Sequence, residues 1–168
     1  MVALLLCACY PRTLKATAAD HDTPGFGLGI ILGEPAGVGV RYWFSSELSG
    51  QLWLGGTWWH RGAQLSTDLM YAVRDFVPLQ TSDVQLDLSF GAGAALGVWT
   101  DVIYCFPRPS TYCETRNRFA LALRGPVTTS LFFSAVPLEL FVELAPSLLL
   151  QPHVGFKLDA GLGLRYYL

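Results

Sequence analysis

Residues 156–168, FKLDAGLGLRYYL, alternate strictly between two kinds of side chain. One face carries no charge and consists of Phe156, Leu158, Ala160, Leu162, Leu164, Tyr166 and Leu168. The other face is small or polar and consists of Lys157, Asp159, Gly161, Gly163, Arg165 and Tyr167. A period of two is that of a β-strand, and the run is longer than the usual five or six residues of a soluble strand. The stretch predicts a tilted strand that crosses a hydrocarbon layer, with an ordinary β-sandwich strand as the alternative.

The composition is poor in charge for a water-soluble protein. Only 14% of the 168 residues are charged, against roughly 25% in soluble domains, while 52% are hydrophobic. A net charge of -2 gives no electrostatic footprint for nucleic acid, and no phosphate-binding or dinucleotide-binding glycine motif occurs. Because no run of about eighteen apolar residues occurs either, the sequence excludes a helical membrane span and leaves a closed β-barrel as the spanning structure.

The first 19 residues have several features of an export signal. Residues 2–9 form a short apolar core, and residues 16–18 (ATA) supply the small side chains that a signal peptidase prefers. Both basic residues of this segment follow the apolar core, so we expect the true start codon to lie upstream. A lipoprotein acylated at Cys9 is the alternative. Either way, we expect residues 20–168 to form a single domain.

The rest of the chain divides into eight alternating runs, which are separated by turn residues such as Gly and Pro. We expect strands at residues 25–33, 38–44, 50–59, 64–74, 84–99, 119–133, 138–145 and 156–168. The predicted fold is all-β, an eight-stranded antiparallel up-and-down transmembrane β-barrel.

Every charged residue of these runs lies opposite the apolar face. The set holds five residues of each sign: Arg41, Asp68, Arg74, Asp87, Arg124, Glu139, Glu143, Lys157, Asp159 and Arg165. Alternation alone does not decide which face is inside, because a soluble periplasmic lipocalin-like barrel would turn its apolar face to a ligand cavity. The charged face is rich in Gly, Ala and Ser, which suits a filled interior, whereas a solvent face would carry many Lys and Glu. We therefore predict an interior charge network.

Aromatic residues of the apolar face gather near the strand ends. One end has Trp58, Phe119 and Phe156, and the other has Phe44, Phe133 and Tyr166. Two such girdles are typical of the two interfaces of a membrane.

The connection at residues 100–117 is the longest between predicted strands. It contains Cys105 and Cys113, whose spacing suits a loop-closing disulfide in an oxidising compartment. Two free thiols are one alternative, and a zinc pair is another, although no His lies nearby. With both chain ends on the periplasmic side, this connection would lie at the outer mouth, where a surface ligand would bind.

The short loop around Pro152 sets the register of the last two strands and places Glu139 opposite Arg165 on the charged face. Removal of one partner from a buried ion pair is strongly destabilising. We therefore expect Arg165→Leu to destabilise the barrel and Glu139→Gln to restore part of that loss.

Three segments carry a resemblance to known proteins: GFGLGIILGEPAGVGVRYWF from Gly25, PLELFVELAPSLLL from Pro137 and AGLGLRYYL from Ala160. Together they resemble a family of small outer-membrane barrel proteins with GLGIILGEP-like openings, similar in architecture to the OmpX and OmpA barrels. The aromatic C-terminus also resembles the closing strand of such barrels. The resemblance spans nearly the whole mature chain, with a weaker match over residues 65–117. It implies an eight-stranded barrel and no settled activity.

The sequence offers little support for catalysis. Outer-membrane lipid hydrolases use a Ser and a His on the outer surface of the barrel, with a third group that orients the His. His60 and Ser66 are near each other in sequence, but no acid is placed to orient the ring. We expect an integral outer-membrane protein with a structural or surface-interaction role and at most a narrow, porin-like pore. We also expect a monomer embedded in outer-membrane lipid, without cofactor, metal or nucleic-acid partner.

Overall fold

The computed structural model describes residues 25–57, 62–78, 84–106, 112–151 and 154–168. For residues 99–106 and 112–118 the backbone alone is described. The predicted export signal and Cys9 lie outside these ranges.

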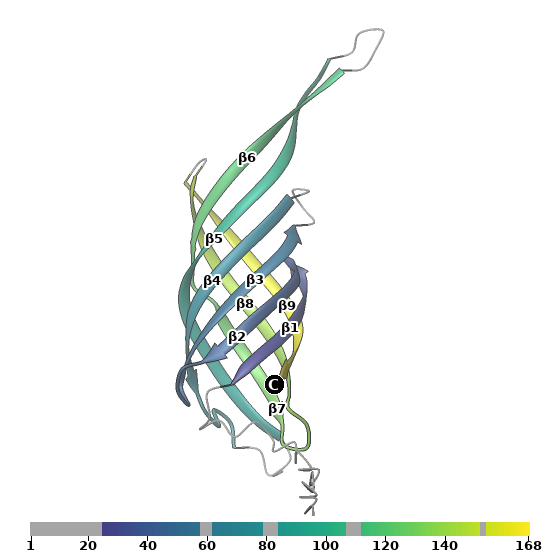
Figure 1. Ribbon diagram of the computed structural model, residues 1–168. Coiled ribbons are helices and arrows are strands. Elements are labelled where there is room, and N and C mark those ends of the chain that lie inside the picture. Colours follow the sequence, from purple (N-terminus) through teal and green to yellow (C-terminus); the bar gives the residue numbers. More distant parts are fainter. Residues whose placement is uncertain (1–24, 58–61, 79–83, 107–111, 152–153) are drawn as a thin grey trace, which may run out of the picture.

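The described chain consists of β-strands joined by turns (Figure 1). The strands are β1 (Phe26–Glu34), β2 (Ala36–Trp43), β3 (Leu48–Thr57), β4 (Gly62–Val73), β5 (Val84–Phe106), β6 (Tyr112–Arg124), β7 (Val127–Phe133), β8 (Leu138–Gln151) and β9 (Gly155–Tyr167). Within the described ranges, no helix is long and apolar enough to span a membrane.

The nine strands occupy eight positions around a closed antiparallel ring. β6 and β7 both pair with β5 on one side and with β8 on the other, so they share one position. The predicted single strand at residues 119–133 is therefore interrupted, at Gly125 and Pro126. Proline has no N–H to give to a ladder, which explains a break inside an otherwise regular run. The predicted all-β, up-and-down antiparallel barrel is confirmed.

The first and last strands close the ring. β1 pairs with β9 from Gly27 opposite Tyr167 to Glu34 opposite Ala160. The backbone N–H of Leu168 donates to the carbonyl oxygen of Phe26 at 2.9 Å, so both ends of the barrel chain lie together. We call this the lower end, which also contains the β2–β3 and β7–β8 turns, and we call the end with the β5–β6 hairpin the upper end (Figure 1).

The sequence predicts a connection at residues 100–117. This prediction is wrong, because the described residues of this stretch belong to strands β5 and β6. The β5–β6 ladder continues through it, from Thr100 opposite Asn117 to Phe106 opposite Tyr112, with an irregularity between Val102 and Tyr104. In Figure 1 this hairpin extends well beyond the other strands. A ladder of this kind depends on hydrogen bonds between two segments, so alternation within either segment is a weak guide to it.

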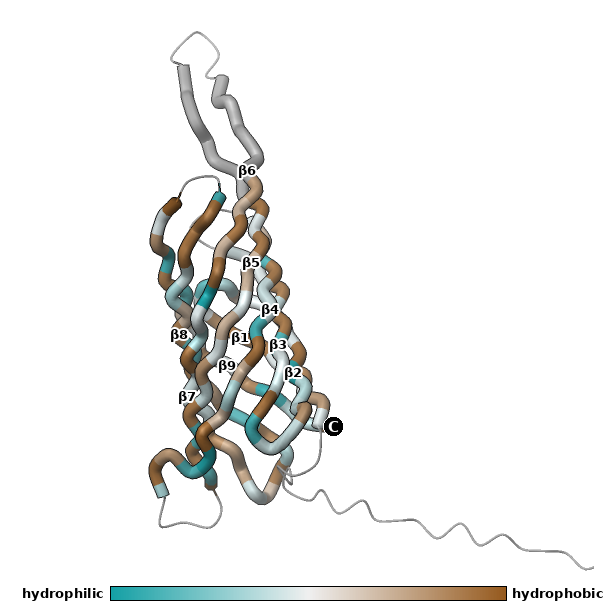
Figure 2. Tube along the Cα trace, turned by 90° about the vertical axis from the view of Figure 1, so that its left-hand side faces the viewer, coloured by the Kyte–Doolittle hydropathy of each residue, from teal (hydrophilic) through white to brown (hydrophobic). Residues whose placement is uncertain are grey.

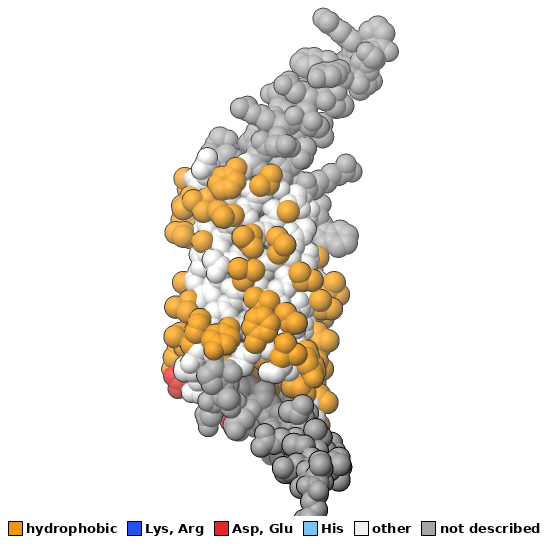
Figure 3. Space-filling view, in the orientation of Figure 1, with side chains coloured by type: hydrophobic (Ala, Val, Ile, Leu, Met, Phe, Trp, Pro, Cys, Tyr) orange, Lys and Arg blue, Asp and Glu red, His pale blue; other side chains and the backbone are white. Residues whose placement is uncertain are grey.

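The apolar and charged faces lie on opposite sides of the wall. Side chains that alternate along each strand are in turn exposed and buried, and hydropathy alternates with them along the trace (Figure 2). In the view of Figure 3 hydrophobic side chains spread over the described wall, and no Lys or Arg is visible there. The apolar face thus looks outward, which is the reverse of the arrangement in a lipocalin-like barrel.

Candidate functional site

The interior of the barrel holds the candidate site, and the β8–β9 pair orders it from bottom to top. The inward residues of β8 are Glu139, Phe141, Glu143, Ala145 and Ser147. Their partners on β9 are Arg165, Gly163, Gly161, Asp159 and Lys157, in that order. The predicted pairing of Glu139 with Arg165 is confirmed. An aromatic level at Phe141 therefore separates two charged levels.

Arg41, Glu139 and Arg165 form the lower charge cluster. Glu139 Oε2 lies 2.5 Å from Arg165 Nη1, and Glu139 Oε1 lies 3.3 Å from Arg41 Nη1. All three residues are 0% exposed. One carboxylate thus pairs with two buried guanidinium groups, and its loss would leave both without a counter-charge.

Hydroxyl groups add hydrogen bonds to Glu139 and Arg41 in the lower charge cluster. Ser130 Oγ donates to Glu139 Oε1 at 2.6 Å, and the Tyr167 hydroxyl donates to Glu139 Oε2 at 2.5 Å. Arg41 donates from Nε to Ser49 Oγ at 2.9 Å and from Nη2 to Ser89 Oγ at 3.3 Å. Each of these hydroxyl groups comes from a different strand, so the cluster joins distant regions of the wall.

Aromatic side chains cover the lower charge cluster from below. Trp43, Phe132 and Tyr167 pack together with Ala72, and the indole N–H of Trp43 donates to the Tyr167 hydroxyl at 3.2 Å. The guanidinium carbons of Arg41 and Arg74 each lie 4.2 Å from the centroid of the Trp43 ring. Such cation–π contacts add stability where water is excluded.

Arg74 and Asp87 form an ion pair near the lower mouth. Arg74 Nη1 lies 2.7 Å from Asp87 Oδ2, and Arg74 also donates to the backbone carbonyl of Ser46. Asp87 Oδ1 accepts from the backbone N–H of Asp75 and from the Gln85 amide. This pair therefore anchors the turns at the lower end to the barrel wall.

Asp68, Arg124, Glu143, Lys157 and Asp159 form the upper charge cluster. Arg124 is its centre: Nη2 lies 2.6 Å from Glu143 Oε1, Nε lies 3.0 Å from Asp68 Oδ1, and Nη1 lies 4.0 Å from Asp159 Oδ2. Lys157 Nζ lies 2.8 Å from Asp159 Oδ1. Here one guanidinium contacts three carboxylates, whereas in the lower charge cluster one carboxylate contacts two guanidinium groups.

Two glutamines connect members of the upper charge cluster. Gln51 donates to Asp68 at 3.1 Å and to Glu143 at 2.9 Å. Gln64 donates to Asp159 at 3.1 Å and accepts from Lys157 at 2.7 Å. An amide can bridge two carboxylates because its nitrogen has two donors. Neither glutamine was predicted as a site residue, although both lie on the charged face of their strands.

Ile31, Trp53 and Phe141 form a middle layer between the two clusters. The ring centroids of Trp53 and Phe141 are 5.5 Å apart, and both side chains are 1% exposed. A Cβ at Gly163 would collide with the Phe141 ring, and one at Gly39 would collide with the Trp53 ring. Glycines in the wall thus provide the room that these rings occupy. One sequence feature could have revealed this layer. It is a large aromatic residue on the charged face that lies opposite a glycine of the next strand.

All ten charged residues of the predicted network point inward, but the structure divides them unequally. The lower charge cluster and the Arg74–Asp87 pair hold three cations and two anions, whereas the upper charge cluster holds two cations and three anions. With all ten groups ionised, the five lower residues have a net charge of +1 and the five upper residues have a net charge of -1. The balance of five against five in the sequence conceals this separation.

Among the side chains that the structure describes, aromatic residues on the outer face are concentrated at the lower end. Of the predicted girdle residues there, Phe44 and Tyr166 are exposed and Phe133 is half-buried. Four further exposed residues at this end were not predicted as girdle residues: Phe26, Tyr42, Tyr71 and Phe90. We call these seven aromatic residues of the lower end the aromatic belt. At the upper end Phe119 and Phe156 are exposed, and Trp58 lies outside the described residues.

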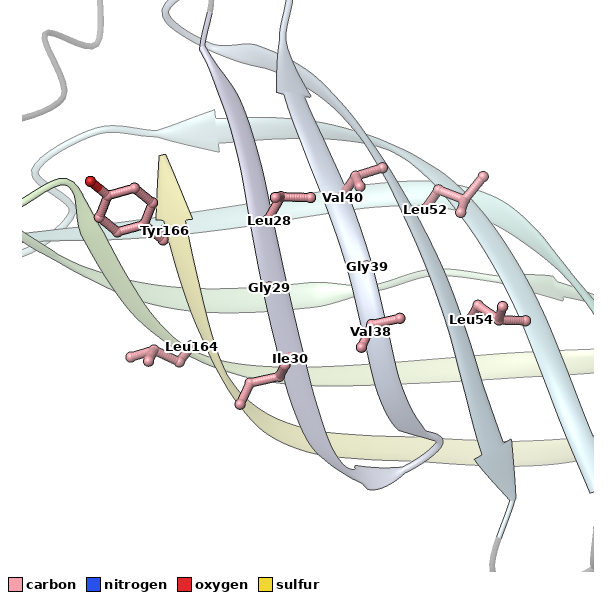
Figure 4. Close-up of a pocket in the computed structure, with 10 residues that line it drawn as sticks. All are labelled: Leu28, Gly29, Ile30, Val38, Gly39, Val40, Leu52, Leu54, Leu164 and Tyr166. Atoms are coloured by element: carbon pink, nitrogen blue, oxygen red, sulfur yellow. The ribbon is translucent and has the colours of Figure 1, made fainter. Parts of the chain in front are cut away.

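An open apolar groove runs over the outer face of β9, β1, β2 and β3 (Figure 4). Its volume is about 610 Å³, and its outward side chains are Leu28, Ile30, Val38, Val40, Leu52, Leu54, Leu164 and Tyr166. Gly29 and Gly39 face each other in the β1–β2 ladder and contribute only backbone to the groove floor. None of the described residues that line the groove is charged.

The structure also bears on the other predicted sites. Ser66 faces the lumen and is buried, so it does not lie on the outer surface where a lipid hydrolase would need it. All three histidines of the chain lie outside the described residues. Cys105 and Cys113 are directly paired in the backbone register of the β5–β6 hairpin, but their side chains are not described. The disulfide stays a prediction.

Comparisons with known proteins support the fold. No family model and no curated protein matches the chain. The N-terminal β-barrel domain of Pseudomonas aeruginosa OprF, known from a crystal structure, has a similar structure, with a TM-score of 0.60 and 15% sequence identity. The alignment covers 87% of this chain and 100% of that one. At this identity the likeness shows a shared barrel fold, and the predicted resemblance to a particular family of small barrels stays a prediction.

Proposed function

We propose that this protein is an integral β-barrel of the bacterial outer membrane, with a structural or surface-interaction role. The position of its charges carries the proposal. Within the described strands, every Lys, Arg, Asp and Glu whose side chain is described is buried or half-buried, while large apolar side chains are exposed along the length of the wall. Water would not favour such a surface, but a hydrocarbon layer would.

The aromatic belt at the lower end supports the same proposal. Its rings lie where the strands meet the lower turns, and the exposed acidic residues Glu47 and Asp75 lie in or next to those turns. Aromatic rings at the level of lipid headgroups, with charge beyond them, are typical of a membrane interface. The soluble lipocalin-like alternative needs an apolar cavity, yet the described lumen is lined by charged, polar and aromatic groups.

Cell fractionation followed by gel electrophoresis tests the proposal. We expect the protein in the outer-membrane fraction, with faster migration when the sample is not boiled, because a closed barrel resists the detergent until it is heated. A soluble periplasmic protein followed in the same cells is the control for clean separation of the fractions. Recovery of the barrel protein in the soluble periplasmic fraction would overturn the membrane assignment.

The packed lumen supports at most a narrow pore. An eight-position barrel has an interior that side chains just fill, and here bulky side chains such as Trp53, Arg41 and Phe141 are fully buried within it. We expect planar bilayers containing the folded protein to show little or no conductance. Stable openings of the size seen with general porins would contradict the filled interior.

A further inference from the structure

We propose that the middle layer of Ile31, Trp53 and Phe141 divides the lumen into two separate chambers and is the barrier that keeps ions from crossing it. This inference deepens the proposed function, since it rests on the same inward-facing interior. It assigns the closure of the barrel to named side chains rather than to the small diameter of the barrel.

The first support is that the partly exposed side chains of the lumen lie towards the two mouths of the barrel and not next to the middle layer. Above it, the Lys157 side chain is 19% exposed, and a cavity of about 10 Å³ next to Lys157 and Asp159 has room for about one water. Next to the layer, Arg124 and Glu143 above it are 4% exposed, and every residue of the lower charge cluster below it is 0% exposed. At the lower mouth the Arg74 side chain is 18% exposed. Solvent that enters from the upper end therefore stops before it reaches Glu139.

The second support is the close packing of the middle layer against the backbone of the wall. Phe141 lies over the backbone of Gly163 on β9, and Trp53 lies over the backbone of Gly39 on β2. The side chain of Ile31 fills the space next to Gly161 in the same manner. These contacts extend the layer across β8, β9, β1, β2 and β3, so a continuous stretch of the wall faces apolar groups at this level.

The third support is electrostatic. No ion pair between described residues joins the lower charge cluster to the upper one, and the two have opposite net charge. Arg165 contacts both Glu139 and the layer, because its guanidinium carbon lies 4.5 Å from the Phe141 ring centroid and 5.3 Å from that of Trp53. A mobile ion would have to shed its water to pass these rings, which is costly in an apolar environment.

Thiol labelling in the detergent-folded protein tests the proposal. The variants carry one cysteine each, in a background with the native cysteines replaced by serine. Lys157→Cys reports on the upper chamber, and Ser130→Cys, next to Glu139, reports on the lower one. With a water-soluble cationic thiosulfonate, we expect rapid labelling of Lys157→Cys and labelling of Ser130→Cys that is slower by about tenfold or more, equal to about 1.4 kcal/mol or more of barrier. Equal rates at the two sites would overturn the division into chambers.

Removal of the ring at Phe141 should connect the chambers. We expect Phe141→Ala to raise the labelling rate of Ser130→Cys by about tenfold and to produce discrete openings in planar bilayers. Phe90→Ala is the matched control, because it deletes the same side chain from the outer face, and it should change neither readout. If folded Phe141→Ala leaves both readouts at the parent level, the layer is not the barrier.

A second route keeps the test decisive if Phe141→Ala does not fold. Phe141→Leu retains an apolar side chain without the ring and should give a smaller rise in Ser130→Cys labelling in the same direction, whereas an unchanged rate would count against the layer. Labelling in detergent reports on the lumen alone and fractionation reports on the location, so either proposal can fail without the other.

Discussion

The lower and upper charge clusters bury charge in different ways. In the lower charge cluster a single carboxylate, Glu139, contacts two guanidinium groups, and all three residues are inaccessible to water. In the upper charge cluster a single guanidinium, Arg124, contacts three carboxylates, which also accept hydrogen bonds from two glutamines. The lower charge cluster therefore depends on one residue, whereas the upper one distributes its charge over several.

The largest effect should come from removal of the lower carboxylate. Glu139→Gln leaves Arg41 and Arg165 buried without a counter-ion, so we expect a loss of about 3–5 kcal/mol in the free energy of unfolding. Urea titration of the barrel in lipid vesicles, followed by gel migration without boiling, measures it. A loss no greater than that of Glu143→Gln would show that the two clusters are equivalent.

A cation placed on the outer face should cost somewhat less. Leu164 is an outward neighbour of Arg165, and Leu164→Arg is expected to lose about 2–4 kcal/mol in vesicles if the site lies near the bilayer midplane. Leu164→Ala provides the control for lost side-chain packing. A harmless Leu164→Arg would mean that this face does not contact lipid.

Removal of Arg165 should have a moderate effect, because Arg41 remains as a partner for Glu139. We expect Arg165→Leu to lose about 1.5–3 kcal/mol, the range for hydrogen bonds to charged groups. The structure reverses the expected outcome of the double variant: adding Glu139→Gln would leave Arg41 alone, so it should lower stability further instead of restoring it. Restored stability in the same urea titration would indicate that Arg41 does not share Glu139.

The upper charge cluster should tolerate loss of an acid. Glu143→Gln removes one of three carboxylates around Arg124 and makes the cluster neutral, so we expect a loss of only about 0.5–1.5 kcal/mol. Double-variant analysis with Asp68→Asn should show strong coupling, because Gln51 bridges the two side chains. Additive losses would argue against a shared network.

The smallest effect on the barrel should come from the cysteines. The register pairs Cys105 with Cys113 in a stretch of the hairpin that has no other strand beside it among the described residues. Mass spectrometry of the alkylated protein should show one disulfide, and its reduction should change barrel stability by less than about 0.5 kcal/mol. Two alkylated thiols in protein from the oxidised periplasm would refute the pairing.

Alternation within single strands carries most of the information about the fold. Because side chains in a strand point to opposite faces in turn, the sequence assigns Arg41, Asp68 and Glu143 to one face before any partner is known. Short turns also fix register, as the Glu139–Arg165 pair illustrates. Neither feature tells which cation a given carboxylate meets across the lumen, since those contacts join strands that are not neighbours, such as β2 and β8 for Arg41 and Glu139.

The alternation of side chains along the sequence could not predict two other features. The break at Pro126 depends on one missing N–H, so its prediction requires attention to a single residue. The β5–β6 hairpin depends on pairing between two segments, so its prediction requires tertiary information. The middle layer was missed for a related reason. Trp53 and Phe141 alternate correctly with the charged residues, but their role follows from the glycines that face them on adjacent strands.

The most direct test of a lipid-facing apolar wall is the collision of spin labels with oxygen and with a water-soluble nickel chelate. Nitroxides would be attached to single cysteines at Val142 and Leu144, two outward positions of β8, in the protein folded into lipid vesicles. We predict more frequent collisions with oxygen, which concentrates in the hydrocarbon, than with the chelate. Collisions dominated by the nickel chelate at both positions would contradict a wall that faces lipid.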